Sequence, residues 1–461
     1  MAASLLDAYQ LVHDGAVALS VVERNGMRID VEYCREKIDW LDGKIAQAER
    51  RLKGTQLYHA WEARYGSKLK YSSAPQLRSV LYADLHVKPF KQTEGGEESA
   101  DEESLRQTGV EGIDHLLKMR KYKKTQDFLC GFLRYEIDGR IHPSYMLHTV
   151  TTYRSSSSSP NMQNVPKRDK ESMEICRRAL IPSPGCQILE IDFSGVEVSL
   201  SACYHKDPSM IRYLKDPTSD MHADTALDLF MLQGLNTKLK DMSGGPTLRQ
   251  ASKNGFVFPQ FYGDYYVTCA FNVACNWLKL PQTRDWRASD GIEFNGAPIA
   301  GHLVSRGIEA LSDYEEHVRK VEKNFWNRRF PVYKRWRDSW HRDYQRTGGF
   351  EMLSGFRCAG VFGRNQVTNY PVQGTAFHCL LWTLIQLVNR TRGWRSKVIG
   401  EVHDSVLFDA HPDEVTELVA LTKQVAEVEL AKNWKWIIVP MRVESSISEI
   451  DGSWASMRTV E

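Results

Sequence analysis

The sequence predicts an α+β fold in which strands that end in carboxylates alternate with long helical segments. Residues 189–193 form a short apolar run that contains Asp192, which is typical of a buried strand leading to a sheet end. Residues 198–203 are predicted to be helical, so Asp192 is expected at a break between strand and helix. Residues 398–408 are rich in β-formers on both sides of His403-Asp404. This pattern predicts a hairpin with an acidic turn.

The composition bounds the class of protein but not its function. A chain of 461 residues, 42% of them hydrophobic, is long enough to bury a large core. Its nine cysteines are scattered without a CxxC pair, so neither a zinc site nor a disulfide framework is indicated, and a cytoplasmic compartment is expected. No segment resembles a signal peptide or a membrane span. The net charge of +2 neither indicates nor excludes a polyanionic partner.

The elements outside these two stretches are expected as follows. Asn25-Gly26 is a turn signal, and Asp30 is a candidate N-cap for a helix over residues 31–52. Apolar residues at helical spacing predict a core helix over residues 369–388, and residues 436–444 predict a further strand.

A basic run over residues 118–124 lies on another predicted helix. Such a run is usually a solvent-exposed face, and contact with phosphates along a duplex is the alternative.

Two strands that each present an aspartate are suited to hold a pair of divalent cations. Hard oxygen ligands suit Mg²⁺, and a metal pair serves in-line displacement at phosphorus. Taken alone, Asp192 or Asp404 is more often a turn or cap residue, so the blocks between them decide the interpretation.

Five blocks of sequence follow one another in the order of a known enzyme family. Residues 192–197 (Asp-Phe-Ser-x-x-Glu), residues 249–263 and His403-Asp404 resemble motifs A, B and C of the family A DNA polymerases, the DNA polymerase I family. Residues 152–166 are similar to the family's Thr-Gly-Arg-x-Ser-Ser-x-x-Pro-Asn-x-Gln-Asn-x-Pro block. Residues 369–376 are similar to its Asn-x-Pro-x-Gln-Gly-Thr-Ala block. The resemblance runs from about Val22 to the C-terminus, and a polymerase domain of the phage or viral type is expected.

The resemblance implies the right-hand polymerase fold, with an antiparallel palm sheet and a largely helical thumb and fingers. The expected divisions are 1–147 for the thumb with an N-terminal palm-linked segment, 148–205 for the first part of the palm, 206–362 for the fingers and 363–461 for the second part of the palm. Because the thumb-like sequence starts close to Met1, no 3′–5′ exonuclease domain is expected in this chain.

The implied activity is template-directed DNA synthesis, in which dNTPs are added to a primer 3′-hydroxyl by two-metal nucleotidyl transfer. The implied cofactors are two Mg²⁺ ions, for which Mn²⁺ can substitute. The implied partners are primer-template DNA, dNTPs and a separate exonuclease or other replication proteins, with no membrane.

The resemblance also carries site residues over, position by position. The catalytic residues are Asp192, Asp404 and Lys253, of which the two aspartates are the metal ligands. The nucleotide-binding residues are Arg249, Lys253, Phe258, Tyr262, His222 and Glu197, with Glu197 as the steric gate against ribose. The DNA-binding residues are Arg154, Asn161, Gln163, Asn164, Asn369, Gln373, His403, Lys121 and Lys124.

Three departures from the family pattern carry expectations of their own. Tyr153 stands where the family has glycine, and Ser405 stands where a glutamate often follows the second aspartate. In motif B, Arg249 and Lys253 keep the four-residue step, but Phe258 and Tyr262 come one residue late. One residue more than α-helical spacing allows therefore lies between Lys253 and Phe258. Because proline removes a helical hydrogen bond and glycine tolerates distortion, we expect a bulge or kink near Gly255–Pro259.

Two alternative functions stay open at this point. A single-subunit RNA polymerase would share the palm and the aspartate pair, although Glu197 and the Arg154 block argue against it. A catalytically silent DNA-binding subunit would not require Asp192, Asp404, Arg249 and Lys253, all of which are present.

Overall fold

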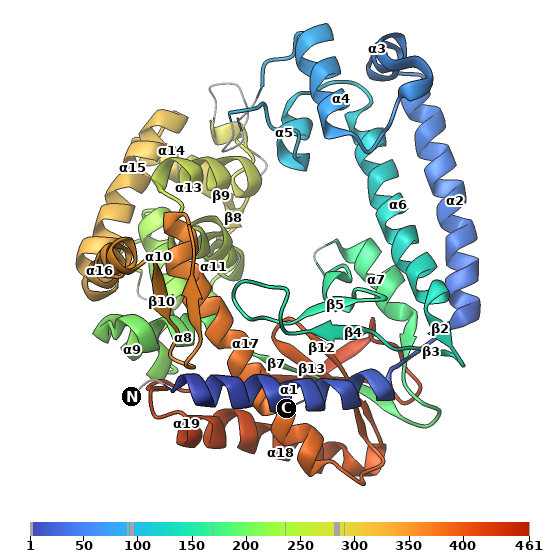
Figure 1. The fold of residues 1–461 in the computed structure, drawn as a ribbon. Helices are drawn as coiled ribbons and strands as arrows, with labels where there is room; N and C mark the ends of the chain where they lie inside the picture. The colour runs from blue at the N-terminus through green and yellow to red at the C-terminus, as the bar shows by residue number, and fades with distance from the viewer. Residues whose placement is uncertain are drawn as a thin grey trace.

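The computed structural model describes residues 3–89, 92, 96–167, 169–235, 237–280, 286–289 and 291–460. Figure 1 shows a base that contains the main sheet, with one helical lobe rising from each of its two sides. None of the helices in the described part of the chain combines the length and the apolarity that crossing a bilayer requires.

The base is built on a five-stranded antiparallel sheet. Its strands, in spatial order, are β12 (Lys397–Val402), β13 (Ser405–Ala410), β7 (Gln187–Phe193), β14 (Val443–Ser448) and β15 (Met457–Val460). The predicted strand before Asp192 and the predicted hairpin around His403-Asp404 are both confirmed as β7 and β12–β13. β7 lies between β13 and β14, so neither edge of the strand that carries Asp192 is free.

Helices cover the side of this sheet that faces away from the two lobes (Figure 1). They are α1 (Leu5–Asn25), α17 (Arg364–Arg390), α18 (Val415–Lys423), the π-helical η10 (Gln424–Glu429) and α19 (Leu430–Asn433). α1 crosses α17 closely at Gly15, where a Cβ would lie only 2.7 Å from Leu381 Cδ2. Glycine is therefore required for this helix pair to pack against the palm.

The first helical lobe is a long two-helix hairpin with a small cap. α2 (Val31–Lys53) packs along α6 (Ile113–Arg134), and the cap contains α3 (Gln56–Tyr65), α4 (Ala74–Arg78), η2 (Ser79–Asp84) and α5 (Glu102–Gln107). The predicted cap of α2 is confirmed, because Asp30 Oδ1 accepts a hydrogen bond from Tyr33 N at 3.0 Å. The buried residues Cys34, Leu41 and Ala48 repeat every seven positions, a spacing typical of paired helices.

The second helical lobe contains the segment matched to motif B. Its elements are α9 (Pro208–Lys215), α10 (Met221–Leu229), α11 (Gly245–Ser252), η5 (Lys253–Val257), α12 (Phe258–Tyr262), α13 (Tyr266–Asn272), η6 (Val273–Trp277), β8 (Glu293–Phe294), β9 (Ala297–Pro298), α14 (Ile299–Ser305), α15 (Leu311–Asn324), η8 (Phe325–Arg329), α16 (Pro331–Thr347) and the hairpin β10 (Gly349–Glu351) and β11 (Arg357–Ala359). An aromatic core that includes Phe256, Phe261 and Phe325 holds these helices together.

Short elements connect the base to the first lobe. A four-stranded sheet has the order β2 (Glu136–Ile137), β3 (Arg140–Ile141), β1 (Met27–Ile29) and β6 (Leu180–Ile181). Next to it lie the pair β4 (Ser144–Met146) and β5 (Ser156–Ser158), the 3₁₀ turn η3 (Met162–Asn164) and α7 (Lys170–Arg178). The predicted break after Asp192 leads into α8 (Val196–His205).

One predicted strand is wrong. Residues 436–444 form no strand before Val443, although Trp436, Ile437 and Val439 are buried as a strand would bury them. The chain turns instead, with Ile437 N donating to Trp434 O at 2.9 Å, and Pro440 has no N–H to give to a ladder. An apolar run shows that a segment is buried, but its backbone hydrogen bonds decide its conformation.

Candidate active site

The two candidate metal ligands meet at one end of the main sheet. Asp192 is the cross-strand partner of Ser405, the residue after Asp404, and Phe193 N donates to Asp404 O at 3.1 Å. His403 forms the turn before Asp404 with a positive φ of 61°. The register of β7 against β13 therefore places the two aspartates, which are distant in sequence, beside each other.

More carboxylates than cationic side chains act on Asp192. The pKa of Asp192 is raised to about 6, first by burial and then by the carboxylates of Asp404, Glu190 and Glu444, against the opposing charge of Lys167. Lys167 Nζ lies 3.9 Å from Asp192 Oδ2, and an Arg154 guanidinium nitrogen lies 3.7 Å from Asp404 Oδ1. A carboxylate held among other carboxylates favours a bound cation.

The oxygen ligands of this site fit Mg²⁺. Within the described residues, no group of three His, Cys, Asp or Glu side chains is arranged to hold a metal ion. Mg²⁺ is commonly bound through one or two carboxylates, with waters and substrate phosphate oxygens completing its shell. Asp192 and Asp404 match that pattern, so the residues present are compatible with the implied ions.

A cavity of about 510 Å³ opens beside the aspartate pair. Glu197, Phe258, Tyr262 and Asp404 line it, as do Asn369 and Gln373 from α17. A second cavity of about 420 Å³ adjoins it and shares Gly195, Val198 and Phe258 with it. The second cavity is lined by His222, Arg249 and Lys253. The carboxylates and the cations expected to bind one nucleotide thus lie in two connected hollows.

The predicted distortion of motif B is confirmed. Residues Lys253–Val257 form a π-helical turn, η5, between α11 and α12, and Phe258 N bonds Lys253 O, five residues back. This wider turn absorbs the extra residue. Gly255 packs tightly against the next helix, because a Cβ there would lie 2.6 Å from Val273 Cγ2. As a result Lys253 Nζ lies 5.2 Å from the ring centroid of Phe258, and both Phe258 and Tyr262 line the first cavity.

Glu197 lies at the centre of a small polar cluster. Its Oε2 accepts a hydrogen bond from the Tyr262 hydroxyl, and its Oε1 lies 4.0 Å from the Arg154 guanidinium. Burial and the neighbouring Glu197 raise the pKa of Tyr262. Burial also raises the pKa of Glu197. The cluster closes the floor of the cavity beside Asp404.

His222 and Arg249 lie together in the second cavity. Burial, and then the charge of Arg249, lower the pKa of His222 to about 4, so the imidazole is neutral at pH 7. Its ring packs edge-on to Phe258 at 5.7 Å between centroids. Arg249 Nε donates to Asp220 Oδ2 at 2.5 Å, so its guanidinium is oriented by an ion pair on the adjacent helix.

The residues expected to bind DNA fall into two groups. Arg154, Asn369, Gln373 and His403 lie at the cavity or its turn, with Asn369 Nδ2 donating to Tyr262 O at 3.2 Å. The remaining candidates line neither cavity, and they are Asn161, Gln163, Asn164, Lys121 and Lys124.

Several members of that second group already have partners within the protein. Gln163 Nε2 donates inward to Ser155 and Glu401, and Asn161 Oδ1 caps η3 by accepting from Asn164 N. Lys121 Nζ lies 2.5 Å from Glu171 Oε2, whereas Lys124 is exposed. A role in DNA binding for Gln163 or Lys121 would require these contacts to break, so Lys124 is the better placed of the two lysines.

Residues 40–264 match the family model described as DNA polymerase family A. These residues are thus similar to DNA polymerase family A, as the sequence motifs predicted. The chain is 26% identical over 457 residues to the thermostable DNA polymerase I of Thermus thermophilus, covering 95% of this chain and 47% of that protein. It is 26% identical over 450 residues to DNA polymerase I of Chloroflexus aurantiacus, covering 95% of this chain and 42% of that protein. The chain spans about half the length of the curated relatives it matches.

A solved structure supports the fold of this chain. It is the POL domain of Pol1 from M. smegmatis in complex with DNA primer-template and dNTP, with a TM-score of 0.72 at 20% identity, covering 96% of this chain and 70% of that one. The predicted right-hand fold with an antiparallel palm sheet is thereby confirmed. No comparison tests the expected phage or viral type, which stays a prediction.

The motif analysis missed three charged residues that the fold places at the site. Lys167 lines the first cavity next to Asp192, Glu444 is the cross-strand partner of Asp192 on β14, and Glu401 lies on β12 near the Arg154 segment. The only signal for Lys167 was its position directly after the matched block that ends at Pro166. Glu444 and Glu401 had no local signal, because strand pairing and packing bring them there.

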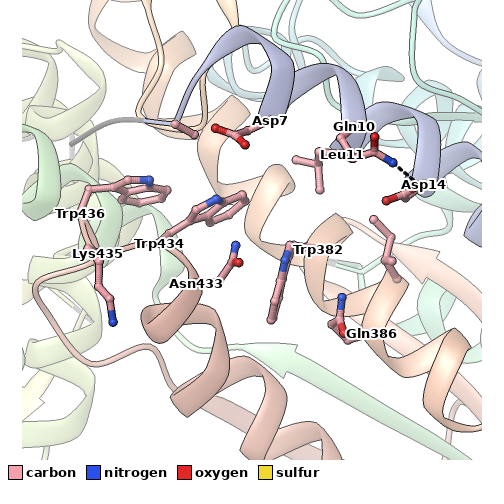
Figure 2. A pocket seen from close by; sticks show the side chains of 12 residues that line it. Asp7, Gln10, Leu11, Asp14, Trp382, Gln386, Asn433, Trp434, Lys435 and Trp436 are labelled. Carbon is pink, nitrogen blue, oxygen red and sulfur yellow. Dashed lines mark hydrogen bonds between the residues drawn. The ribbon is translucent and has the colours of Figure 1, made fainter.

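A further cavity of about 430 Å³ lies on the other side of the palm, between α1, α17 and the segment after α19 (Figure 2). Its wall contains Trp382, Trp434 and Trp436. Asp7 and Asp14 also line it, but Asp7 accepts from the Ser4 hydroxyl, and Asp14 accepts from Gln10 at 2.8 Å. It shares no lining residue with the catalytic cavity, and its carboxylates have partners on their own helix, so it is not the candidate active site.

Proposed function

We propose that this chain is a DNA polymerase that adds dNTPs to a primer 3′-hydroxyl by nucleotidyl transfer. The observation that carries the proposal is the placement of Asp192 and Asp404 on neighbouring strands, at a cavity that adjoins the Arg249 and Lys253 cavity. The names of the relatives, DNA polymerase I, agree with it, as does a structural neighbour bound to DNA primer-template and dNTP. We also propose a cytoplasmic location, because the nine cysteines are free, as a reducing compartment keeps them.

The carboxylate pair would hold two Mg²⁺ ions, and Mn²⁺ would substitute for them. Such ions, when bound, lower the pKa of the attacking hydroxyl and neutralise charge on the phosphates. The contribution of Asp192 and Asp404 is to hold them at a position fixed by the β7–β13 register. Arg154 and Lys167, which lie within 4 Å of the two aspartates, would add positive charge beside the substrate phosphates.

The π-interrupted helix would bind the triphosphate. Arg249 and Lys253 project into the cavity next to the aspartates, where their charges would offset the negative charge that phosphoryl transfer must stabilise. Lys253, which lines the second cavity, would also give a proton to the departing pyrophosphate. His222 is neutral at pH 7, so its part would be hydrogen bonding and not charge neutralisation.

The base and the sugar would be selected by the aromatic side of the cavity. Phe258 and Tyr262 offer ring faces on which a base pair stacks. Glu197 would fill the space that a ribose 2′-hydroxyl needs, and the Tyr262 hydroxyl bond holds the carboxylate in that position. This arrangement would favour dNTPs over rNTPs.

We assign the lobes of the fold to the parts of a right-hand polymerase as the sequence predicted. The boundaries are 1–147 for the thumb with α1 joined to the palm, 148–205 and 363–461 for the palm, and 206–362 for the fingers. In support, α1 packs on α17 and β12 of the base, and α2 pairs with α6 in the separate lobe. Primer-template DNA would lie between the two lobes, within reach of Arg154 and Lys124.

Primer extension tests the proposal. The pure chain, supplied with a 5′-labelled primer on a defined DNA template, Mg²⁺ and dNTPs, is expected to extend the primer in the order that the template dictates. Parallel reactions with rNTPs and with an RNA template separate this function from a single-subunit RNA polymerase and from a reverse transcriptase. Binding of the duplex without extension under any of these conditions would contradict the proposal and favour a silent DNA-binding subunit.

A further inference from the structure

A carboxylate to which the proposed chemistry gives no role is enclosed beside the catalytic residues. Glu401 lies on β12, shortly before the turn that carries Asp404, and its side chain is 1% exposed. One of its oxygens, Oε1, is buried and has no hydrogen-bond partner among the described residues. Burying a carboxylate with an unpartnered oxygen costs folding free energy. Fold stability alone therefore does not account for a glutamate at this position.

The other oxygen of Glu401 closes a triangle of hydrogen bonds. Oε2 accepts from Ser155 Oγ at 2.7 Å and from Gln163 Nε2 at 3.0 Å, and Gln163 Nε2 also donates to Ser155 Oγ at 2.6 Å. The backbone N–H of Glu401 donates to the Tyr145 hydroxyl at 3.2 Å, and β4, which contains Tyr145, pairs with β5. Glu401 thus fixes the two ends of the segment from Ser155 to Gln163 against the palm sheet.

That segment begins directly after Arg154, whose guanidinium lies 3.7 Å from Asp404 Oδ1 and 4.0 Å from Glu197 Oε1. On the other side of Arg154, the Tyr153 ring packs on Phe356 at 4.8 Å between centroids, and its hydroxyl donates to Arg357 O at 3.0 Å. The backbone is therefore held on both sides of Arg154. A long, flexible arginine keeps a defined place only when its backbone is fixed, because its side chain has many rotamers.

Charged groups from the elements packed around Glu401 act on its carboxylate. The pKa of Glu401 is raised to about 7, mainly by burial and also by the charge of Asp404. The hydrogen bonds from Ser155 and Gln163 and the charge of Arg154 act in the opposite direction. The Tyr145 hydroxyl on β4 bonds the backbone of Glu401 and not its side chain. The electrostatic coupling and the geometry both connect Glu401 with Arg154.

We infer that Glu401 is a positioning residue for the proposed reaction, which through Ser155 and Gln163 holds Arg154 between Asp404 and Glu197. The inference rests on the proposed function. Glu401 itself lines neither cavity, so it acts through Arg154 and does not touch the substrate.

A double-mutant cycle tests this inference. E401A in the otherwise unchanged protein is expected to lower kcat/KM for dNTP incorporation by about tenfold to a hundredfold, because a displacement of about 1 Å in a catalytic group can have an effect of that size. In the R154A protein, E401A is expected to lower kcat/KM by less than about twofold, because Arg154, the residue that Glu401 positions, is absent. E401Q keeps an oxygen that accepts from Ser155, so it should stay within about threefold of the parent. Equal factors for E401A in both backgrounds would overturn the inference, since a merely structural role acts in both.

Asp409 supplies the matched control. It is a buried carboxylate on β13 of the same hairpin, and its bonds go to Ser183, away from Arg154. D409N should therefore change kcat/KM by the same factor in both backgrounds. If D409N changed kcat/KM by different factors in the parent and in the R154A protein, the coupling would be a general effect of the hairpin. That result would also overturn the inference. If E401A does not fold, S155A and Q163A replace it in the double-mutant cycle with R154A. Each of them removes one hydrogen-bond donor to Glu401 Oε2.

A second readout separates this inference from the proposed function. If the unchanged protein extends no primer, the proposed function fails, and the cycle is then measured on duplex affinity by fluorescence anisotropy. E401A is expected to weaken binding of the duplex less in the R154A protein than in the parent. Equal weakening in both would overturn the positioning role independently of catalysis.

Discussion

The candidate active-site cavity has two sides, the proposed palm and the proposed fingers, and they are built from different kinds of local structure. On the palm side, Asp192 and Asp404 come from strands whose register places them together. On the fingers side, Arg249, Lys253 and Tyr262 come from one stretch of helix whose phase directs them toward the cavities. A slip of one residue in a strand turns every side chain to the other face, and β7 pairs with β13 in unbroken register from Gln187 to Asp192. The helix absorbs its extra residue in the π turn of η5.

The comparison teaches where each side of the site is sensitive. The palm side depends on single side chains held at a fixed strand register. The fingers depend on the count of residues between Lys253 and Phe258, so changing the length there matters more than changing an exposed side chain. The predictions below test this contrast from the largest expected effect to the smallest.

Removing either palm carboxylate is expected to have the largest effect. D192A and D404A should each lower kcat for primer extension by about a thousandfold or more, because ion binding supplies several kcal/mol of transition-state stabilisation. Single-turnover extension and duplex affinity are the measurements, and duplex binding should persist. S405A is the control on the adjacent residue and should be mild, since the Ser405 hydroxyl bonds Glu190 and lies outside the cavity lining. Near-normal kcat in D192A or D404A would refute the metal-ligand assignment.

Shortening the fingers helix by one residue should have the next largest effect. Deleting Asn254, which is exposed in η5, would restore α-helical spacing and rotate Phe258 and Tyr262 by about 100° relative to Lys253. We expect kcat/KM for dNTPs to fall about a hundredfold, because aromatic and cationic groups would no longer face the same nucleotide.

The control for this deletion is N254A, which keeps the chain length and should leave kcat/KM within about twofold, since Asn254 lines neither cavity. If the deletion and the substitution behave alike, the π turn has no part in aligning Lys253 with Phe258.

Opening the sugar pocket should have a moderate effect on selectivity. E197A is expected to reduce the ratio of kcat/KM for dNTP over rNTP by about tenfold to a hundredfold, the range that one pocket contact provides. E197Q fills the same space and should keep most of the discrimination. Measured ratios that stay constant in E197A would place the gate on another residue.

The smallest predicted effect is on stability and follows from Glu401. Its pKa is raised from an unfolded value near 4.5 to about 7, so the folded protein binds the proton more tightly than the unfolded chain does. Stability from this group is therefore fully present below about pH 4.5 and is lost as the pH rises to about 7. E401Q cannot ionise and does not undergo this loss. The melting temperature of E401Q minus that of the parent should therefore increase by about 1–2 °C from pH 5 to pH 8. Parallel melting curves for both proteins across this range would contradict the raised pKa.

The sequence by itself determined the local elements and most of the candidate site. Periodicity and capping patterns located β7, the β12–β13 hairpin and the helix capped by Asp30, because such patterns depend on neighbours within a few residues. Counting residues in motif B, together with Gly255 and Pro259, was enough to predict a bulge or kink, which the structure shows to be the π turn of η5. The apolar run at 436–444 failed as a strand because burial alone does not fix backbone pairing.

Only the tertiary structure decided which distant residues share the site. Tyr153 adopts a φ of 57° where the family has glycine, a conformation that costs an L-residue about 1–3 kcal/mol and that its contacts with Phe356 and Arg357 stabilise. Gln163 turns inward to Glu401, and Lys167 approaches Asp192. None of these contacts is encoded by local spacing, because each arises where strand register and loop packing bring separate segments together.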